Sequence, residues 1–191
     1  MIAYLALGGL SAAPLLFFYH LHWLVVFGLV TVLLLAANAQ QAVRREDRTI
    51  NSELMAIAGL TLTAPAAHYV SRSFFEPTAL WLWLLCVFYF SSSVSYVKLR
   101  VATINPHKEE ARRQSSWRCA AYHSILLACL LILALTGSLN LFALAAFSPV
   151  LGRSFWQLAS PVRRVNLRRV GWLEVVYSIV FLVFTTLTFR S

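Results

Sequence analysis

Long apolar blocks alternate with short polar stretches along the whole sequence. Each block holds roughly 17–22 residues, the length that an α-helix needs to cross the hydrocarbon core of a bilayer. The pattern predicts an all-α, polytopic transmembrane helix bundle that forms a single membrane domain over residues 1–191. We expect about seven spans, at 2–18, 22–38, 53–70, 77–97, 119–137, 140–157 and 171–189.

The composition favours a membrane protein as well. Of the 191 residues, 60% are hydrophobic and only 12% are charged, and the mean hydropathy is +0.72. A soluble domain of this size carries about 25% charged residues. The sixth span contains Ser148-Pro149 and ends near Arg153, so we expect a kinked or partly re-entrant helix there.

The basic residues are unevenly distributed between the connecting segments. Fourteen of the 16 Lys and Arg residues fall at 39–52, 98–118 and 153–170, on one side of a seven-span bundle, whereas the other side holds Arg72 and Arg190. Basic loops face the cytoplasm, so we predict a cytoplasmic N-terminus and a C-terminus outside. The net charge of +9 then reflects this asymmetry and an attraction to anionic lipid, and we expect no nucleic-acid partner.

Six ionisable residues from four spans share one depth, within about two helical turns of the cytoplasmic boundary. Charged groups inside a membrane mark function, so they predict a cytoplasm-facing ligand site, in which His123 could relay a proton. The alternatives are helix capping or a plain ion pair for the two glutamates, and a structural hydrogen bond for His123. No catalytic residue, metal ligand or cofactor is assigned. The predicted ligand-binding residues are Glu53, Lys98, Arg100, Arg118, His123 and Glu174.

Helical periodicity places polar residues on one face of two of these spans. One stripe comprises Glu174, Ser178, Phe181, Thr185 and Thr188, and Gly171 extends it; the other comprises Tyr89, Ser93, Tyr96 and Arg100. Polar groups facing lipid lack partners, so both stripes should face protein. We expect Glu174 to meet either Glu53 or a base from another helix, namely Lys98, Arg100 or Arg118.

Four motifs resemble the YwiC-like family of bacterial integral membrane proteins. They are "INSELMAIAGLTLTAPAAHYV" (50–70), "LLCVFYFSSSVSYVKLR" (84–100), "WRCAAYHSILL" (117–127) and "RRVGWLEVVYSIVFLV" (168–183). The resemblance implies a multi-pass protein of the bacterial cytoplasmic (inner) membrane without an established activity. Family members typically begin with a further helical segment headed by a His-Gly-Ala-Trp motif, which this sequence lacks, and many have His where this chain has Tyr177.

That family is distantly similar to the UbiA prenyltransferase superfamily, whose members hold magnesium and a prenyl diphosphate with two Asp-rich motifs. This chain has a single aspartate, Asp47, beside Glu46. Three hypotheses follow. The first is a protein that binds or moves a small anionic or amphipathic ligand, and the second is a degenerate prenyltransferase-like enzyme with an isoprenoid ligand and with Glu46, Asp47 and Glu53 on its metal. The third is a structural membrane-assembly partner without a ligand site.

Overall fold

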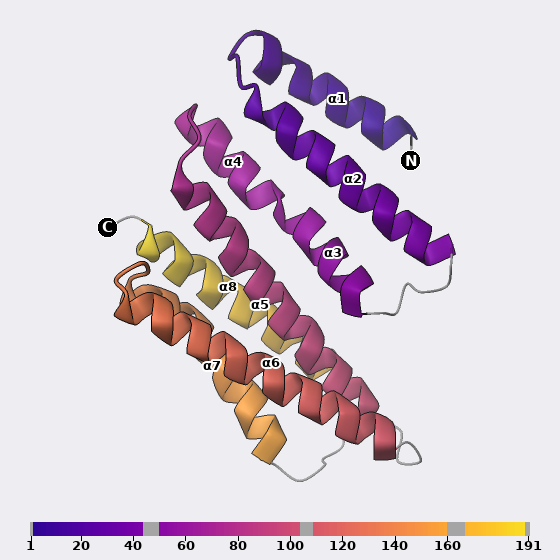
Figure 1. Ribbon diagram of the computed structural model, residues 1–191, viewed down its shortest axis with the longest axis vertical. Coiled ribbons are helices and arrows are strands. Elements are labelled where there is room, and N and C mark those ends of the chain that lie inside the picture. Colours follow the sequence, from indigo (N-terminus) through magenta and orange to yellow (C-terminus); the bar gives the residue numbers. More distant parts are fainter. Residues whose placement is uncertain (1, 44–49, 104–108, 160–166, 190–191) are drawn as a thin grey trace. The chain divides into compact units, whose positions relative to one another are not determined.

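The computed structural model describes residues 2–43, 50–103, 109–159 and 167–189. All regular structure in these ranges is α-helical (Figure 1). The elements are α1 (Ile2–Phe17), α2 (Trp23–Val43), α3 (Ile50–Thr61), α4 (Thr63–Arg72), α5 (Pro77–Ala102), α6 (Glu109–Leu135), α7 (Leu141–Ala159) and α8 (Leu167–Thr188).

Every predicted span coincides with a helix, and the third is interrupted at Leu62 between α3 and α4. The cause is Pro65, which lies in the first turn of α4 and has no backbone N–H to continue an α-helical ladder. The backbone tightens there, since the N–H of Leu62 bonds to the carbonyl of Gly59, three residues back, at 3.3 Å. The all-helical prediction is confirmed.

Among the described residues, five helical segments are long and apolar enough to cross a membrane: Trp23–Gln41, Ser52–Arg72, Pro77–Ala102, Glu109–Leu135 and Arg168–Thr188. The apolar part of α1, Leu7–Phe17, is shorter. In α7, polar side chains such as Arg153 and Gln157 lower the hydropathy. The helices therefore fit a membrane protein, whereas the count of seven spans stays a prediction.

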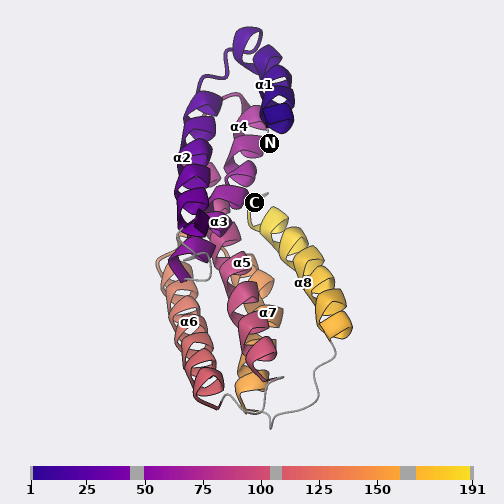
Figure 2. The same cartoon turned by 90° about the vertical axis from the view of Figure 1, so that its right-hand side faces the viewer.

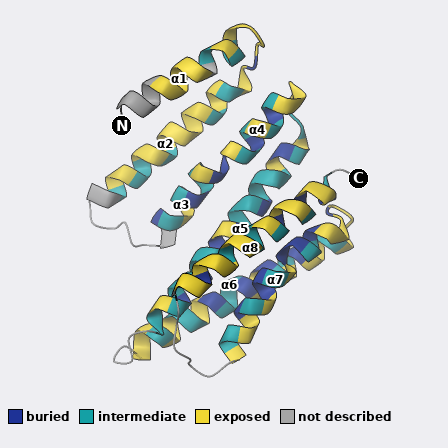
Figure 3. Cartoon of the chain, turned by 180° about the vertical axis from the view of Figure 1, so that it is seen from behind, coloured by how far each residue is buried: buried dark blue, intermediate teal, exposed yellow. Residues whose placement is uncertain are grey.

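The chain divides into two compact units, residues 1–87 and 88–191. In the first unit α2 packs against α3 and α4, and the Trp83 indole N–H donates to the carbonyl of Ala58 at 3.1 Å. Most of α2 is exposed, as the yellow ribbon of Figure 3 shows. Its exposed side chains are mainly Val and Leu, as expected of a helix that faces lipid.

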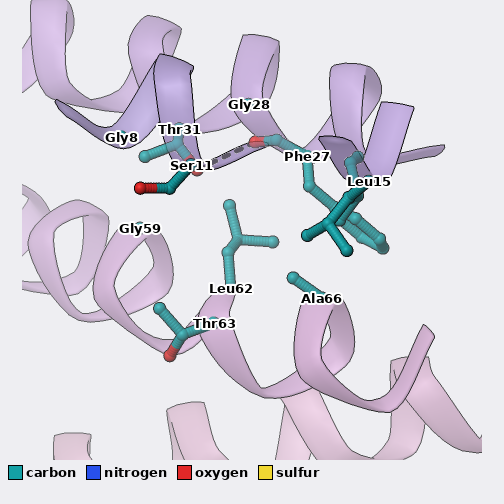
Figure 4. Close-up of a pocket in the computed structure, with 11 residues that line it drawn as sticks. Gly8, Ser11, Leu15, Phe27, Gly28, Thr31, Gly59, Leu62, Thr63 and Ala66 are labelled. Atoms are coloured by element: carbon teal, nitrogen blue, oxygen red, sulfur yellow. Dashed lines mark hydrogen bonds between the residues drawn. The ribbon is translucent and has the colours of Figure 1, made fainter. Parts of the chain in front are cut away.

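An open groove of about 390 Å³ lies between α1, α2 and the α3–α4 segment in the first unit (Figure 4). Its walls are small or apolar, for example at Gly8, Gly28 and Gly59, and the hydroxyl groups of Ser11, Thr31 and Thr63 are its polar side chains. No lining residue can ionise, so the groove offers nothing to hold a charged ligand.

The second unit is built around α7, which packs against both α6 and α8 (Figures 1 and 2). Its core contains an aromatic cluster from three helices. The Tyr89 and Phe181 rings stack at 4.2 Å, and Phe147 meets Phe181 edge-on at 5.4 Å. Next to these rings along the bundle lies a layer of polar side chains from α5, α6, α7 and α8.

The two predicted stripes face each other in this unit. Phe181, Thr185 and Thr188 are buried on α8, and the Tyr89 hydroxyl of α5 lies 3.1 Å from the Ser178 hydroxyl of α8. The prediction that both stripes face protein is confirmed for these residues. It is wrong for Gly171, which is exposed, with open space around the position of a Cβ.

Replacement of Thr185 tests the stripe. Thr185→Leu should lower stability by about 1–3 kcal/mol, because the added volume must fit a packed interface where Thr185 is only 6% exposed. Thr185→Val should be neutral or stabilising, since the Thr185 hydroxyl is buried without a hydrogen-bond partner. The control Val183→Leu, at a site that is 50% exposed, should change stability by less than about 0.5 kcal/mol. Thermal unfolding in detergent measures all three, and equal tolerance of both leucine variants would contradict the stripe.

Candidate functional site

Two pairs of consecutive residues organise the polar layer of the second unit. They are Ser92 and Ser93 on α5, and Arg153 and Ser154 on α7. Consecutive side chains on a helix point about 100° apart, so each helix reaches two neighbours at one level. Ser92 and Ser154 bond to a histidine on α6, whereas Ser93 and Arg153 bond to a glutamate on α8.

Arg153 and Glu174 form a salt bridge inside the bundle. The Arg153 Nη1 donates to Glu174 Oε1, and the Ser93 hydroxyl donates to Oε2 at 2.9 Å. The Arg153 Nη2 also lies 3.3 Å from the Ser93 oxygen, to which it donates. The side chains are only 7% and 21% exposed, respectively. Three helices thus contribute to one hydrogen-bonded ion pair.

Two tyrosine rings clamp the Arg153 guanidinium. Its central carbon lies 4.3 Å from the ring centroid of Tyr96 and 4.9 Å from that of Tyr177. Such contacts stabilise a cation by about 0.5–2 kcal/mol each, and they hold the guanidinium plane in place. The Arg153 Nε is buried without a hydrogen-bond partner. Arg153 therefore retains an unused donor beside its carboxylate partner.

His123 forms a separate, closed cluster on α6. Its side chain is fully buried, and its Nδ1 donates to the carbonyl of Cys119 at 2.7 Å. Its Nε2 lies 2.8 Å from the hydroxyl of Ser92 and 2.9 Å from that of Ser154. Both ring nitrogens thus have partners, which makes His123 a structural link between α5, α6 and α7.

The structure corrects the predicted partner of Glu174. Its salt-bridge partner is Arg153, not Lys98, Arg100 or Arg118. Arg100 donates to Gln157 on α7 at 2.5 Å and lies 6.0 Å from the Tyr96 ring, so it borders the site. Lys98 is half-buried on α5, and Arg118 is exposed on α6.

The remaining predicted residues lie elsewhere in the chain. Glu53 belongs to the first turn of α3, in the first unit, and its pairing with Glu174 stays a prediction. Glu46 and Asp47, named for the metal of the enzyme hypothesis, lie outside the described residues. Within the part of the chain that the structure describes, no group of three His, Cys, Asp or Glu side chains could hold a metal ion.

Arg153 is the residue that the sequence analysis missed as a site residue. Arg153 counts among the basic residues of the segment 153–170 that we expect on the cytoplasmic side, although it also lies near the end of the sixth predicted span, 140–157. In the structure α7 continues past Pro149 to Ala159. The apolar residues after Arg153, namely Phe155, Trp156 and Leu158, were the available signal that it belongs to the helix.

Comparison with known proteins gives one weak similarity. No family model and no solved structure matches the chain. The chain is similar to an uncharacterised protein of Haemophilus influenzae (strain ATCC 51907 / DSM 11121 / KW20 / Rd), with 24% identity over 184 residues. The match covers 95% of this chain and 70% of the relative. Identity at this level assigns neither a family nor an activity.

Neutralising Glu174 tests the ion pair. Glu174→Gln should destabilise the protein by roughly 3–5 kcal/mol, because it leaves the guanidinium of Arg153 buried without a counter-charge. The matched control is Glu109→Gln, since Glu109 is exposed in the first turn of α6 and should contribute only about 0–1 kcal/mol. Chemical unfolding in detergent measures both variants. Similar losses for the two would show that the pair is not stabilising in solution.

Proposed function

We propose that this protein is a multi-pass membrane protein that binds a small anionic or amphipathic ligand at the Arg153–Glu174 site. The observation that supports the proposal most is the environment of the Arg153 side chain. Its side chain is only 7% exposed, its guanidinium lies close to two tyrosine rings, and its Nε has no hydrogen-bond partner. An arginine so placed has donor capacity that an anion can use.

The energetics of membranes support this proposal. A charged side chain in a span is costly, and a buried ion pair is often no better for stability than apolar residues of the same volume. The pair stands beside an apolar aromatic cluster. A role in ligand binding gives a reason for placing two charges there.

The surrounding residues define the class of ligand. A guanidinium binds carboxylates, phosphates and sulfonates through its planar array of donors. The Ser93 hydroxyl can donate to an anion once it is released from Glu174, to which it now donates. The rings of Tyr96 and Tyr177 offer an apolar surface to the rest of an amphipathic molecule. Glu174 acts as the internal counter-ion when no ligand is present.

A second candidate is a structural membrane-assembly partner. The closed cluster of His123 favours it, because the side chain is fully buried and its partners are neutral hydroxyl and carbonyl groups. Under this interpretation the only role of the ion pair is to hold the helices together. The prenyltransferase-like reading depends on Glu46 and Asp47, and it stays a prediction.

The membrane topology is part of the proposal. We infer seven spans in the bacterial cytoplasmic membrane, with the N-terminus inside and the C-terminus outside, and a relationship to the YwiC-like proteins. The uneven distribution of basic residues supports this orientation. Arg153 and Glu174 then lie toward the cytoplasmic side, where a ligand from the cytoplasm can reach them.

Anion binding tests the proposed function. The purified protein in nanodiscs is titrated with acetate, benzoate, benzenesulfonate and inorganic phosphate, and binding is followed by calorimetry. We expect at least one to bind, and Arg153→Gln to weaken its binding at least tenfold, since about 1.5–3 kcal/mol is usual for a hydrogen bond to a charged group. The control Arg113→Gln removes an exposed base of α6 and should not change affinity. Absence of binding by all four anions, or binding unaffected by Arg153→Gln, would contradict the proposal.

Fusion reporters test the topology. Alkaline phosphatase fused to the C-terminus should be active in a bacterial host, because an external C-terminus places the enzyme where it folds. Green fluorescent protein at the same position should be dark. The opposite result would show an even number of spans if the N-terminus is cytoplasmic, and α7, with its lower hydropathy, would be the first segment to reassign.

A further inference from the structure

We propose that anion binding at this site is coupled to the uptake of one proton by Glu174. This inference rests on the proposed function and adds a regulation to the same site. It follows from the charge balance around Arg153, from the partners of the two Glu174 oxygens, and from the closure of the neighbouring histidine cluster.

When an anion occupies the site, a second negative charge beside the single guanidinium is energetically unfavourable. In the free protein the carboxylate of Glu174 balances the guanidinium of Arg153. An anion that binds to Arg153 would add a second negative charge in an environment where each uncompensated charge costs several kcal/mol. A proton on Glu174 restores neutrality, because the anion then takes the place of the carboxylate as the counter-ion.

Among the described residues, few groups face Glu174 from the packed helices. From α7 it meets Arg153, and from α5 it meets the hydroxyl of Ser93. Tyr89 and Tyr96 on α5 lie nearby, and Tyr177 lies on α8 itself. Arg100 is close to the Tyr96 ring. Of these groups Glu174 alone is a carboxylic acid, and it is in direct contact with Arg153.

The hydrogen bonds of Ser93 can accommodate the proton. Its hydroxyl now donates to Glu174 Oε2 at 2.9 Å. When Oε2 takes a proton from solvent, the new O–H can donate to the Ser93 oxygen, and the hydroxyl hydrogen of Ser93 turns toward the anion. The hydrogen bond from Arg153 to Glu174 is exchanged for one from Arg153 to the anion. The proton leaves a hydronium ion of the solvent, so one O–H bond is broken there while the new O–H forms on Glu174, and no other covalent bond changes.

The neighbouring histidine is not the proton acceptor in this scheme. Both ring nitrogens of His123 are engaged within its own cluster, which uses a different face of α5 and α7 from the one that meets Glu174. The two clusters share helices but not atoms. Proton uptake on anion binding should therefore depend on Glu174 and persist without an ionisable group at position 123.

The experiment measures the affinity for benzenesulfonate, which stays ionised across the range, from mildly acidic to mildly alkaline pH in nanodiscs. We expect the dissociation constant of the wild-type protein to rise with pH by up to about tenfold per unit, the limit for one proton per anion. Glu174→Gln, which mimics the protonated acid, should bind tightly at every pH with no slope. His123→Asn, which keeps two hydrogen-bonding groups, should retain the slope of the wild type.

A direct proton count supports the same test without a variant. In weak buffer with a pH indicator, the wild-type protein should take up one proton for each benzenesulfonate bound at alkaline pH. Binding that depends on Arg153 but shows no slope and no proton uptake would overturn the coupling and leave the proposed function intact. A slope that survives in Glu174→Gln, or disappears in His123→Asn, would also overturn it. If the wild-type protein and Glu174→Gln bind neither benzenesulfonate nor any of the other three anions at any pH, the proposed function itself is overturned.

Discussion

The second unit depends on one constraint: a charge inside an apolar bundle needs its counter-charge and its hydrogen bonds from the protein itself. The guanidinium of Arg153 finds them on two other helices, in Glu174 and Ser93. Because the pair forms only when these side chains are at the same level, it fixes the register of α5, α7 and α8 relative to each other. The tyrosine rings of Tyr96 and Tyr177 then limit how far the guanidinium can turn.

Helices α5 and α7 carry a second polar cluster that differs in its chemistry. Ser92 precedes Ser93 and Ser154 follows Arg153, and both bond to the buried ring of His123. Neutral hydroxyl groups satisfy that ring without a net charge, so the cluster closes on itself and joins α6 to the bundle. The ion pair, by contrast, joins two opposite charges, and in the proposed function an anion replaces the carboxylate of Glu174. One polar layer thus combines a closed neutral cluster with a charged contact between helices.

Much of this arrangement follows from the sequence. The apolar blocks predict the helices, and the phase of Tyr89, Ser93 and Tyr96, and of Glu174 and Ser178, predicts the faces that point into the bundle, because period and burial are local properties. The partner of Glu174 is not local. Several bases lie at a similar depth, and only the rotation of each helix about its axis decides which reaches the carboxylate. Arg153 counted with the basic residues at 153–170, and Ser148-Pro149 predicted a kinked or re-entrant segment, whereas a helix can accommodate such a pair when its neighbours support the backbone. The break at Leu62 has a visible cause in Pro65, but how neighbouring residues respond depends on tertiary packing.

Glu53 and Glu174, which looked alike in the sequence, illustrate the difference between a local and a tertiary cause. Glu53 lies in the first turn of α3, where an unpaired set of N–H groups and the helix dipole favour a negative charge. Glu174 is seven residues beyond Leu167, the first residue of α8. The dipole effect falls off within the first turn, so helix capping cannot account for a carboxylate two turns inside. Its position is instead accounted for by Arg153, which lies on another helix and is itself nearly buried. A carboxylate that compensates a buried guanidinium is also the one that an incoming anion must replace, so the role of Glu174 in folding and its proposed role in binding arise from the same contact.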